Sequence, residues 1–202
     1  MKYKWLNKND TKDLIIFFNG WGMDENVIEH INAGSYNVIM LYDYNSLDFD
    51  FNIINNYENK YIVAWSMGIM CATLFNIDNV VSATAINGTL KPIDDEFGIP
   101  KRIYDLTLKG FSPKGRERFI KNMFDETENL PTIKREFENQ KSELSALKNY
   151  EANLNFKYTK IYISNNDKII PTKNQEAFWN MKSNLNGGHC PFGLFNSWSE
   201  LL

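Results

Sequence analysis

The sequence has 202 residues, a length that accommodates one domain with a sizeable hydrophobic core. Its hydrophobic content of 43% and aromatic content of 14% exclude an intrinsically disordered chain. The net charge of −3 argues against a nucleic-acid-binding protein, which needs a broad basic face. The chain shows no apolar signal segment and no run of about 18 apolar residues, and Cys71 and Cys190 do not make a disulfide scaffold. We therefore expect a cytoplasmic, monomeric protein without a nucleic-acid or membrane partner.

Short apolar runs, separated by polar or glycine-containing turns, recur along the chain. Runs that are apolar on both faces are typical of parallel strands covered by helices. Their alternation with helical stretches predicts a doubly wound α/β fold. The predicted strands cover residues 13–18, 36–42, 61–65, 80–87 and 160–164, and the predicted helices cover residues 24–31, 69–75 and 171–179.

The segment from about residue 94 to 153 interrupts this alternation, because it has no strong strand signal. Its residues 117–124 and 133–148 have the periodicity of amphipathic helices. In the second helix, Phe137, Leu144 and Leu147 form the expected buried stripe, and Lys, Glu and Gln side chains are expected to fill the other face. We expect one domain over residues 1–202, with this segment inserted as a small helical lid over the site.

The strongest chemical signal is Ala64-Trp65-Ser66-Met67-Gly68, which ends a predicted strand and opens a helix. A serine at such a sharp turn projects its hydroxyl above the sheet, and small residues two positions before and after it relieve crowding. Taken alone, the pattern is almost equally compatible with a chance turn, since short motifs often arise by chance. Its place between a strand and a helix favours a nucleophilic serine.

A nucleophilic serine needs a base, and the chain has two histidines. His30 lies within a predicted helix, and we interpret it as a surface or core residue. His189 follows two glycines, which leave room for its imidazole to reach the site. Asp167 follows the predicted strand 160–164, at the end of the sheet where ligands bind, although Asn- and Asp-rich turns are common there too. The order Ser66, Asp167, His189 is that of α/β-hydrolases and predicts a triad of nucleophile, acid and base.

Two backbone amides are predicted to stabilise the negative oxygen that forms during acyl transfer. The amide of Met67 lies at a predicted helix N-terminus, where free N–H groups and the helix dipole favour an anion. Trp21 lies between two glycines in the turn after the first predicted strand, so its amide can approach a substrate oxygen. A plain tight turn before a helix capped by Asp24 is the simpler interpretation, and both can hold. We expect no metal and no other cofactor.

Taken together, four motifs resemble the α/β-hydrolase superfamily and, more narrowly, the short pimeloyl-[acyl-carrier protein] methyl ester esterases of the BioG type. They are NGWG at residues 19–22, WSMG at 65–68, NNDKIIP at 165–171 and GGH at 187–189. The resemblance implies hydrolysis of the methyl ester of pimeloyl-acyl carrier protein to pimeloyl-acyl carrier protein and methanol, in biotin precursor synthesis. It carries over the triad and both amide donors.

Two departures from the superfamily pattern matter. Asn19 stands where many hydrolases have a histidine before the glycine. The N-terminal segment is also short for the usual leading hairpin, which predicts a sheet with reduced N-terminal strands.

Residues 101–121 carry seven basic and two acidic side chains, a local charge of +5. Acyl carrier proteins are strongly acidic, so a basic lid would steer one to the site entrance. A solvated helix face explains the same charge run about equally well. The seven candidate carrier-protein-binding residues are Lys101, Arg102, Lys109, Lys114, Arg116, Arg118 and Lys121.

The triad leaves more than one function open, because the same oxyanion chemistry serves several substrates. The first is an esterase for a protein-tethered acyl chain. The second is a general carboxylesterase or thioesterase for small acyl esters. The third is a non-catalytic binding protein that retains the hydrolase pocket, and it is disfavoured because a binding protein has no need of the acid.

Overall fold

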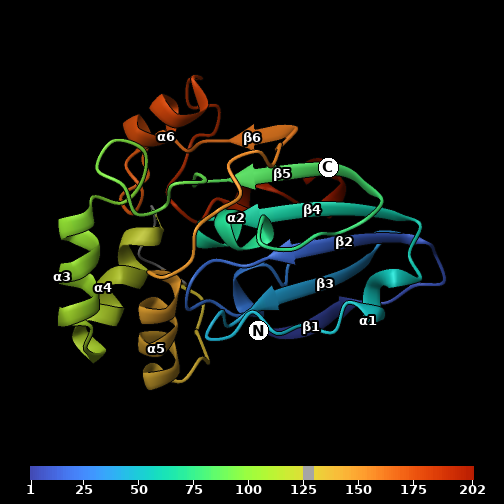
Figure 1. Ribbon diagram of the computed structural model, residues 1–202, viewed down its shortest axis with the longest axis horizontal. Coiled ribbons are helices and arrows are strands. Elements are labelled where there is room, and N and C mark those ends of the chain that lie inside the picture. Colours follow the sequence, from blue (N-terminus) through green and yellow to red (C-terminus); the bar gives the residue numbers. More distant parts are fainter. Residues whose placement is uncertain (125–129) are drawn as a thin grey trace.

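The computed structural model describes residues 1–124 and 130–202, which form one six-stranded sheet in the order β1-β3-β2-β4-β5-β6 (Figure 1). β1 pairs antiparallel with β3, and every other neighbouring pair is parallel. This arrangement confirms the predicted, mostly parallel α/β fold. The strands are β1 (Lys2–Asn7), β2 (Asp13–Phe18), β3 (Asn37–Tyr42), β4 (Asn59–Trp65), β5 (Val80–Ile86) and β6 (Lys160–Tyr162).

Short helices connect these strands in the described part of the chain. None of the helices within that part is long and apolar enough to cross a membrane. The α-helices are α1 (Asn52–Asn55), α2 (Met67–Ala72), α3 (Lys101–Gly110), α4 (Pro113–Met123), α5 (Phe137–Leu147) and α6 (Thr172–Trp179), and the 3-10 turns are η1 (Glu25–Val27), η2 (Phe192–Leu194) and η3 (Trp198–Leu201).

Strand β2 shows why the parallel strands are apolar throughout. Leu14, Ile16 and Phe18 belong to the core on one face of the sheet, and Ile15 and Phe17 belong to the core on the other, all fully buried. The first core includes side chains of α2, α3 and α5, and the second includes side chains of η2 and η3. Burying each such side chain contributes roughly 1.5–3 kcal/mol, so both faces fix the register of β2.

Strand β1 is not among the predicted elements. Its first three side chains are exposed and its last three are half-buried, so it has no apolar run. It pairs with β3 from Lys2 opposite Tyr42 to Asn7 opposite Val38. Residues 1–12 contain this one strand, which lies at the edge of the sheet. The lysines of this strand disfavour further pairing at the edge.

The predicted helix at residues 24–31 is wrong, because the structure has only the short turn η1 there. Asp24 caps that turn by accepting from the Asn26 amide at 3.1 Å. The amides of Ile28 and Ile31 then donate to carbonyl groups three residues earlier, at Glu25 and Ile28. Successive tight turns bury these isoleucines at a three-residue spacing, which imitates helical periodicity.

Helices α3, α4 and α5 lie between β5 and β6 in the chain and beyond the carboxyl ends of the parallel strands in space (Figure 1). Because β5 and β6 are neighbours, the chain leaves the sheet and returns beside the same strand. We call residues 87–159 the insertion; its residues 125–129, within the predicted lid, lie outside the described part. The prediction did not include α3.

Helix α5 differs from the expected amphipathic pattern. Leu144 and Leu147 are buried as predicted, and Phe137 is half-buried. Gln140 and Glu143 were assigned to the solvent-facing side, but both are buried. Their partners belong to loops of the sheet, so the helix contacts neighbours on more than one side.

Candidate active site

Ser66 lies at the turn between β4 and α2, with φ 57° and ψ −124°. A residue other than glycine in this region is strained by about 1–3 kcal/mol, and such strain clusters at functional sites. Small neighbours permit the turn. A Cβ on Gly68 would lie 2.3 Å from the Phe18 carbonyl oxygen, and one on Gly88 would lie 2.8 Å from the Ser66 carbonyl oxygen. The Ser66 hydroxyl is thereby held at the carboxyl end of β4, and Met67 becomes the first residue of α2.

The structure brings the three predicted triad residues together. His189 Nε2 lies 2.9 Å from Ser66 Oγ, and His189 Nδ1 lies 2.7 Å from Asp167 Oδ2. All three residues are buried. An imidazole in this position can accept the hydroxyl proton while the carboxylate stabilises the charge that results.

Asp167 is held by donors from its own turn and from α6. Its Oδ1 accepts from the amides of Ile169 at 2.8 Å and Ile170 at 2.9 Å. Its Oδ2 accepts from Gln175 Nε2 at 2.8 Å, in addition to His189. Such neutral donors fix the orientation of an ionised carboxylate. The sequence analysis missed Gln175, because its contact depends on how α6 packs against the turn.

The loop that carries His189 is anchored to the ends of two central strands. The His189 carbonyl oxygen accepts from Trp65 Nε1 at 2.8 Å and from Asn87 Nδ2 at 3.0 Å. Asn87 also donates to Ser164 Oγ at 2.8 Å and accepts from the Ser164 amide at 2.7 Å. Asn87 thus ties β5, β6 and the histidine loop together. Its position as the last residue of the predicted strand 80–87 is the one signal by which the sequence could have indicated it.

The loop after β2 brings Trp21 to the same site. Glycine is required at position 20, because the Cβ of any other residue would lie 2.8 Å from the Trp65 ring. Asn19 stabilises the turn by accepting from the Gly20 amide at 2.8 Å and by donating to the Asp24 carbonyl oxygen at 3.2 Å. Among the described residues, no hydrogen-bond acceptor contacts the Trp21 amide. A free amide of this kind can donate to a negative oxygen.

One cavity of about 380 Å³ is bounded by Ser66, Met67, His189 and Trp21. The insertion supplies most of its remaining wall. The apolar wall residues include Ile99, Ile103, Tyr104, Leu106, Phe111, Phe119 and Leu144, and the polar ones include Arg118, Asn122 and Lys168. A cavity of this size and character accommodates an extended acyl chain.

The seven candidate basic residues of α3 and α4 differ in exposure. Six are exposed, and Arg118 among them also lines the cavity. Arg116 is half-buried, and its Nη2 donates to the carbonyl oxygens of Ile133 at 2.9 Å and Arg135 at 3.1 Å. Arg116 therefore holds the insertion together, and we remove it from the candidate carrier-protein surface.

The second histidine of the chain and an acid at the end of another strand both lie outside the triad. His30 is exposed, and its Nε2 lies 3.0 Å from the Phe192 carbonyl oxygen. Asp43, an acid at the end of β3, is buried with Lys2 at 2.8 Å and Arg135 at 3.5 Å. Neither residue contacts Ser66 or His189.

Comparison with known proteins adds the family. A family model described as "Pimeloyl-ACP methyl esterase BioG" matches residues 1–201. The "Malonyl-[acyl-carrier protein] O-methyltransferase" of Bacteroides fragilis (strain 638R) is 36% identical over 179 residues, which are 83% of this chain and 36% of that protein. The chain thus spans about a third of the length of this relative.

Solved structures agree with the family model. The crystal structure of BioG from Haemophilus influenzae matches with a TM-score of 0.92 at 30% identity, covering 100% of this chain and 99% of that one. A lipase-esterase related protein from Clostridium acetobutylicum matches with a TM-score of 0.66 at 13% identity, covering 94% and 92%, which shows the fold alone. The chain has the α/β-hydrolase fold and belongs to the BioG family, whose model is described as pimeloyl-ACP methyl esterase.

Proposed function

We propose that the protein hydrolyses the methyl ester of pimeloyl-acyl carrier protein to pimeloyl-acyl carrier protein and methanol. The observation that carries the proposal is the hydrogen-bonded series Ser66, His189 and Asp167, of which Ser66 and His189 line a mostly apolar cavity. Membership of the BioG family supports the substrate. Free thiols at Cys71 and Cys190 favour a reducing compartment, the cytoplasm.

In the first step, His189 Nε2 takes the proton from Ser66 Oγ as that oxygen attacks the ester carbonyl carbon. The carbonyl oxygen becomes negative and is stabilised by the amides of Trp21 and Met67. The imidazolium, stabilised by Asp167, then returns the proton to the departing methoxide. Methanol leaves, and the acyl group remains bound to Ser66 as an ester.

In the second step, water replaces methanol as the reacting partner. His189 takes a proton from this water as it attacks the acyl carbon, and the same two amides stabilise the negative oxygen. The intermediate collapses, the proton returns to Ser66 Oγ, and the free carboxylate is released.

The residues that line the cavity support the proposal that an acyl chain enters it from the surface. Its apolar wall suits the methylene chain of a pimeloyl group, whose far end is joined to the carrier protein. Arg118 and Lys168 place positive charge on the same wall, and both can attract an acidic partner or its prosthetic arm. A general carboxylesterase or thioesterase for small acyl esters would use the same triad and is the second candidate.

A fluorophosphonate probe tests whether the site is catalytic. Only a serine activated by a base labels readily, so the wild-type protein is expected to label stoichiometrically and the Ser66→Ala variant not at all. Labelling is measured by intact-protein mass. A wild-type protein that does not label would support the non-catalytic binding protein instead.

Substitutions among the six exposed basic residues of α3 and α4 test whether the substrate is carried by an acidic protein. Lys101→Glu with Arg102→Glu, or Lys109→Glu with Lys114→Glu, is expected to raise KM for the carrier-bound ester roughly 3–10-fold at low salt. These side chains act on encounter, so turnover of a small uncharged ester stays unchanged. The effect on KM fades as salt rises, since exposed charges are screened beyond about 8 Å at physiological ionic strength.

Lys8→Glu with Lys12→Glu is the matched control for these variants. Both lysines are exposed near the amino end of β2, opposite to the insertion, and the change in net charge is identical. This control should leave KM unchanged. Equal losses of activity on the carrier-bound ester and on the small ester would indicate a damaged insertion. If neither pair of substitutions changes KM for the carrier-bound ester, the basic residues form only a solvated helix face.

A further inference from the structure

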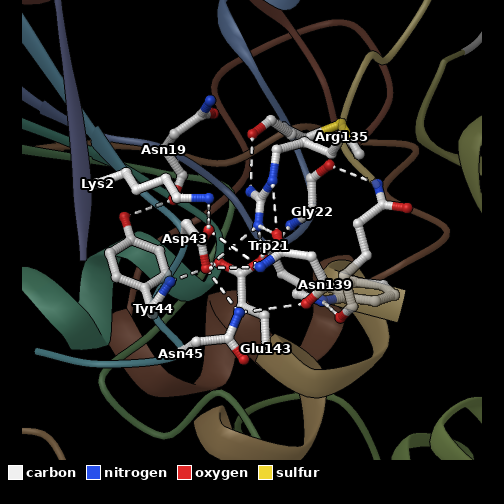
Figure 2. Close-up of polar contacts among 12 residues, drawn as sticks. Lys2, Asn19, Trp21, Gly22, Asp43, Tyr44, Asn45, Arg135, Asn139 and Glu143 are labelled. Carbon is white, nitrogen blue, oxygen red and sulfur yellow. Dashed lines mark hydrogen bonds and ion pairs between the residues drawn. The ribbon is translucent and has the colours of Figure 1, made fainter. Parts of the chain in front are cut away.

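Helix α5 of the insertion holds the loop that carries the Trp21 amide (Figure 2). Trp21 Nε1 donates to the Gln140 carbonyl oxygen at 2.8 Å, and Gln140 Nε2 donates to the Gly22 carbonyl oxygen at 2.7 Å. The Gly22 amide donates to Glu143 Oε2 at 3.1 Å. The groups around the Trp21 amide are thus fixed, while that amide itself remains free among the described residues.

The Glu143 carboxylate joins this loop to the loop after β3. Its Oε1 accepts from the Tyr44 amide at 2.9 Å, and its Oε2 also accepts from Arg135 Nη2 at 3.0 Å. Tyr44 in turn donates its hydroxyl to the Asn19 carbonyl oxygen at 2.8 Å. Figure 2 shows these side chains converging on the turn from three segments of the chain. Both ends of the Asn19 to Gly22 turn are therefore tied to one buried network.

The conformation of Gly22 explains why the turn needs such support. Gly22 has φ +72°, a conformation that glycine adopts far more readily than most residues, and glycine restricts the rotation of its peptide groups least. The Gly22 amide is the next N–H after that of Trp21. If its acceptor is lost, the peptide groups on either side can turn, and the Trp21 amide then leaves the cavity.

A contribution to the stability of the fold does not explain why a glutamate occupies position 143. Glu143 is fully buried, and burial raises its pKa, opposed by the Arg135 guanidinium and the two amide donors. When folding raises the pKa of a carboxyl group, the folded state loses stability as the pH rises from the ordinary pKa of the group to its raised pKa. Replacing buried ion pairs by apolar groups is often neutral or stabilising. Burial of this carboxyl group therefore lowers the stability of the fold once the pH exceeds the ordinary pKa of the group.

We propose that Glu143 is a positioning residue for ester hydrolysis, which fixes the Gly22 peptide and thereby aims the Trp21 amide at the oxygen that becomes negative. The inference rests on the proposed function, since it takes Ser66 as the nucleophile. Glu143 touches no substrate and acts only through the loop. Its loss should therefore change the reaction rate and leave binding of the substrate unchanged.

The test compares Glu143→Leu and Glu143→Gln on a small uncharged ester. Glu143→Leu removes both acceptors and is expected to lower kcat about 10–100-fold, with KM within about twofold, because misplacing or losing one oxyanion donor acts on the transition state. Glu143→Gln keeps one carbonyl oxygen that can still accept from the Gly22 amide. It should recover a large part of the loss.

Asp43→Asn is the matched control, because Asp43 belongs to the same buried network but does not contact the loop. It binds Lys2, Arg135, Asn45 and Asn139, and its φ of 60° is one that asparagine tolerates. This variant should lower Tm and leave kcat unchanged. If Asp43→Asn and Glu143→Leu lower kcat equally, or if Glu143→Gln recovers nothing, Glu143 has a structural role only.

Phenylboronic acid gives a second measurement, because its adduct with a serine nucleophile is tetrahedral and negative. Its inhibition constant should rise in Glu143→Leu by about the factor by which kcat falls, and should not change in Asp43→Asn. If Glu143→Leu does not fold, Gln140→Met, which loses only the contact to the Gly22 carbonyl oxygen, must show the same fall in kcat at constant KM. A wild-type protein without turnover or fluorophosphonate labelling overturns the proposed function itself, whereas an active wild type with unchanged variants overturns this inference alone.

Discussion

Replacing Ser66 with alanine is expected to lower kcat by at least about 10⁴-fold on every ester substrate. The change removes the oxygen that forms the acyl-enzyme and leaves the backbone turn and both amide donors in place. The folded state should keep its stability, because alanine is no larger than serine and, within the described part of the chain, the lost hydroxyl bonds only to His189. Steady-state kinetics measures the loss, and thermal unfolding followed by circular dichroism verifies the fold.

Ser82→Ala is the control for this variant. Ser82 lies on β5, and among the described residues its buried hydroxyl oxygen has no hydrogen-bond partner. We expect unchanged turnover from Ser82→Ala. Turnover near the wild-type value from purified Ser66→Ala would remove Ser66 from the mechanism.

The Asp167→Asn variant should lower kcat by roughly 10³–10⁴-fold with little change in Tm. Its amide oxygen can still accept from Ile169 and Ile170, so the turn persists. Its NH₂ group, however, faces His189 Nδ1 and favours the tautomer that carries a proton on Nε2. That tautomer cannot accept the proton of Ser66, and the charged imidazole loses its carboxylate partner. The kinetic constants of the purified variant measure the effect.

Two further variants distinguish this assignment from its alternatives. Asp43→Asn should retain activity, and if it rather than Asp167→Asn abolishes hydrolysis, the acid has been assigned incorrectly. His30→Gln should be close to neutral, since His30 is exposed and, among residues 1–124 and 130–202, its side chain is hydrogen-bonded only to a backbone carbonyl group. It serves as the control for His189→Gln, which should be as inactive as Ser66→Ala.

The predicted parts of the fold are those in which local pattern and tertiary role coincide. Strand β2 covers the predicted residues 13–18 without a shift, because a run that is apolar on both faces has one stable place in a covered parallel sheet. The strand–Ser66–helix order also places the nucleophile, Asp167 follows β6 in the chain, and His189 lies in the loop after α6. His189 is hydrogen-bonded to both Ser66 and Asp167.

The parts that the sequence did not predict depend on distant partners. Strand β1 is mostly exposed and is stabilised by pairing with β3, so its residues carry no apolar pattern. Gln140 and Glu143 are polar residue types that are typical of a solvated helix face. In the structure they are buried, and they bind the amide and carbonyl groups of a loop some 120 residues away in sequence. Arg116 belongs to a basic run that is typical of a binding surface, but its side chain donates to backbone carbonyl groups of the same insertion.

The central claim is that Ser66 cleaves the methyl ester of a carrier-bound pimeloyl group and leaves the carrier linkage intact. The most direct measurement is the intact mass of pimeloyl-acyl carrier protein methyl ester after incubation with the enzyme in ¹⁸O-labelled water. We expect loss of the methyl group as methanol, one ¹⁸O in the new carboxylate, an unchanged carrier thioester, and no reaction with Ser66→Ala. Release of the whole acyl chain, or an unchanged carrier-bound ester beside rapid hydrolysis of a small free ester, would contradict the claim.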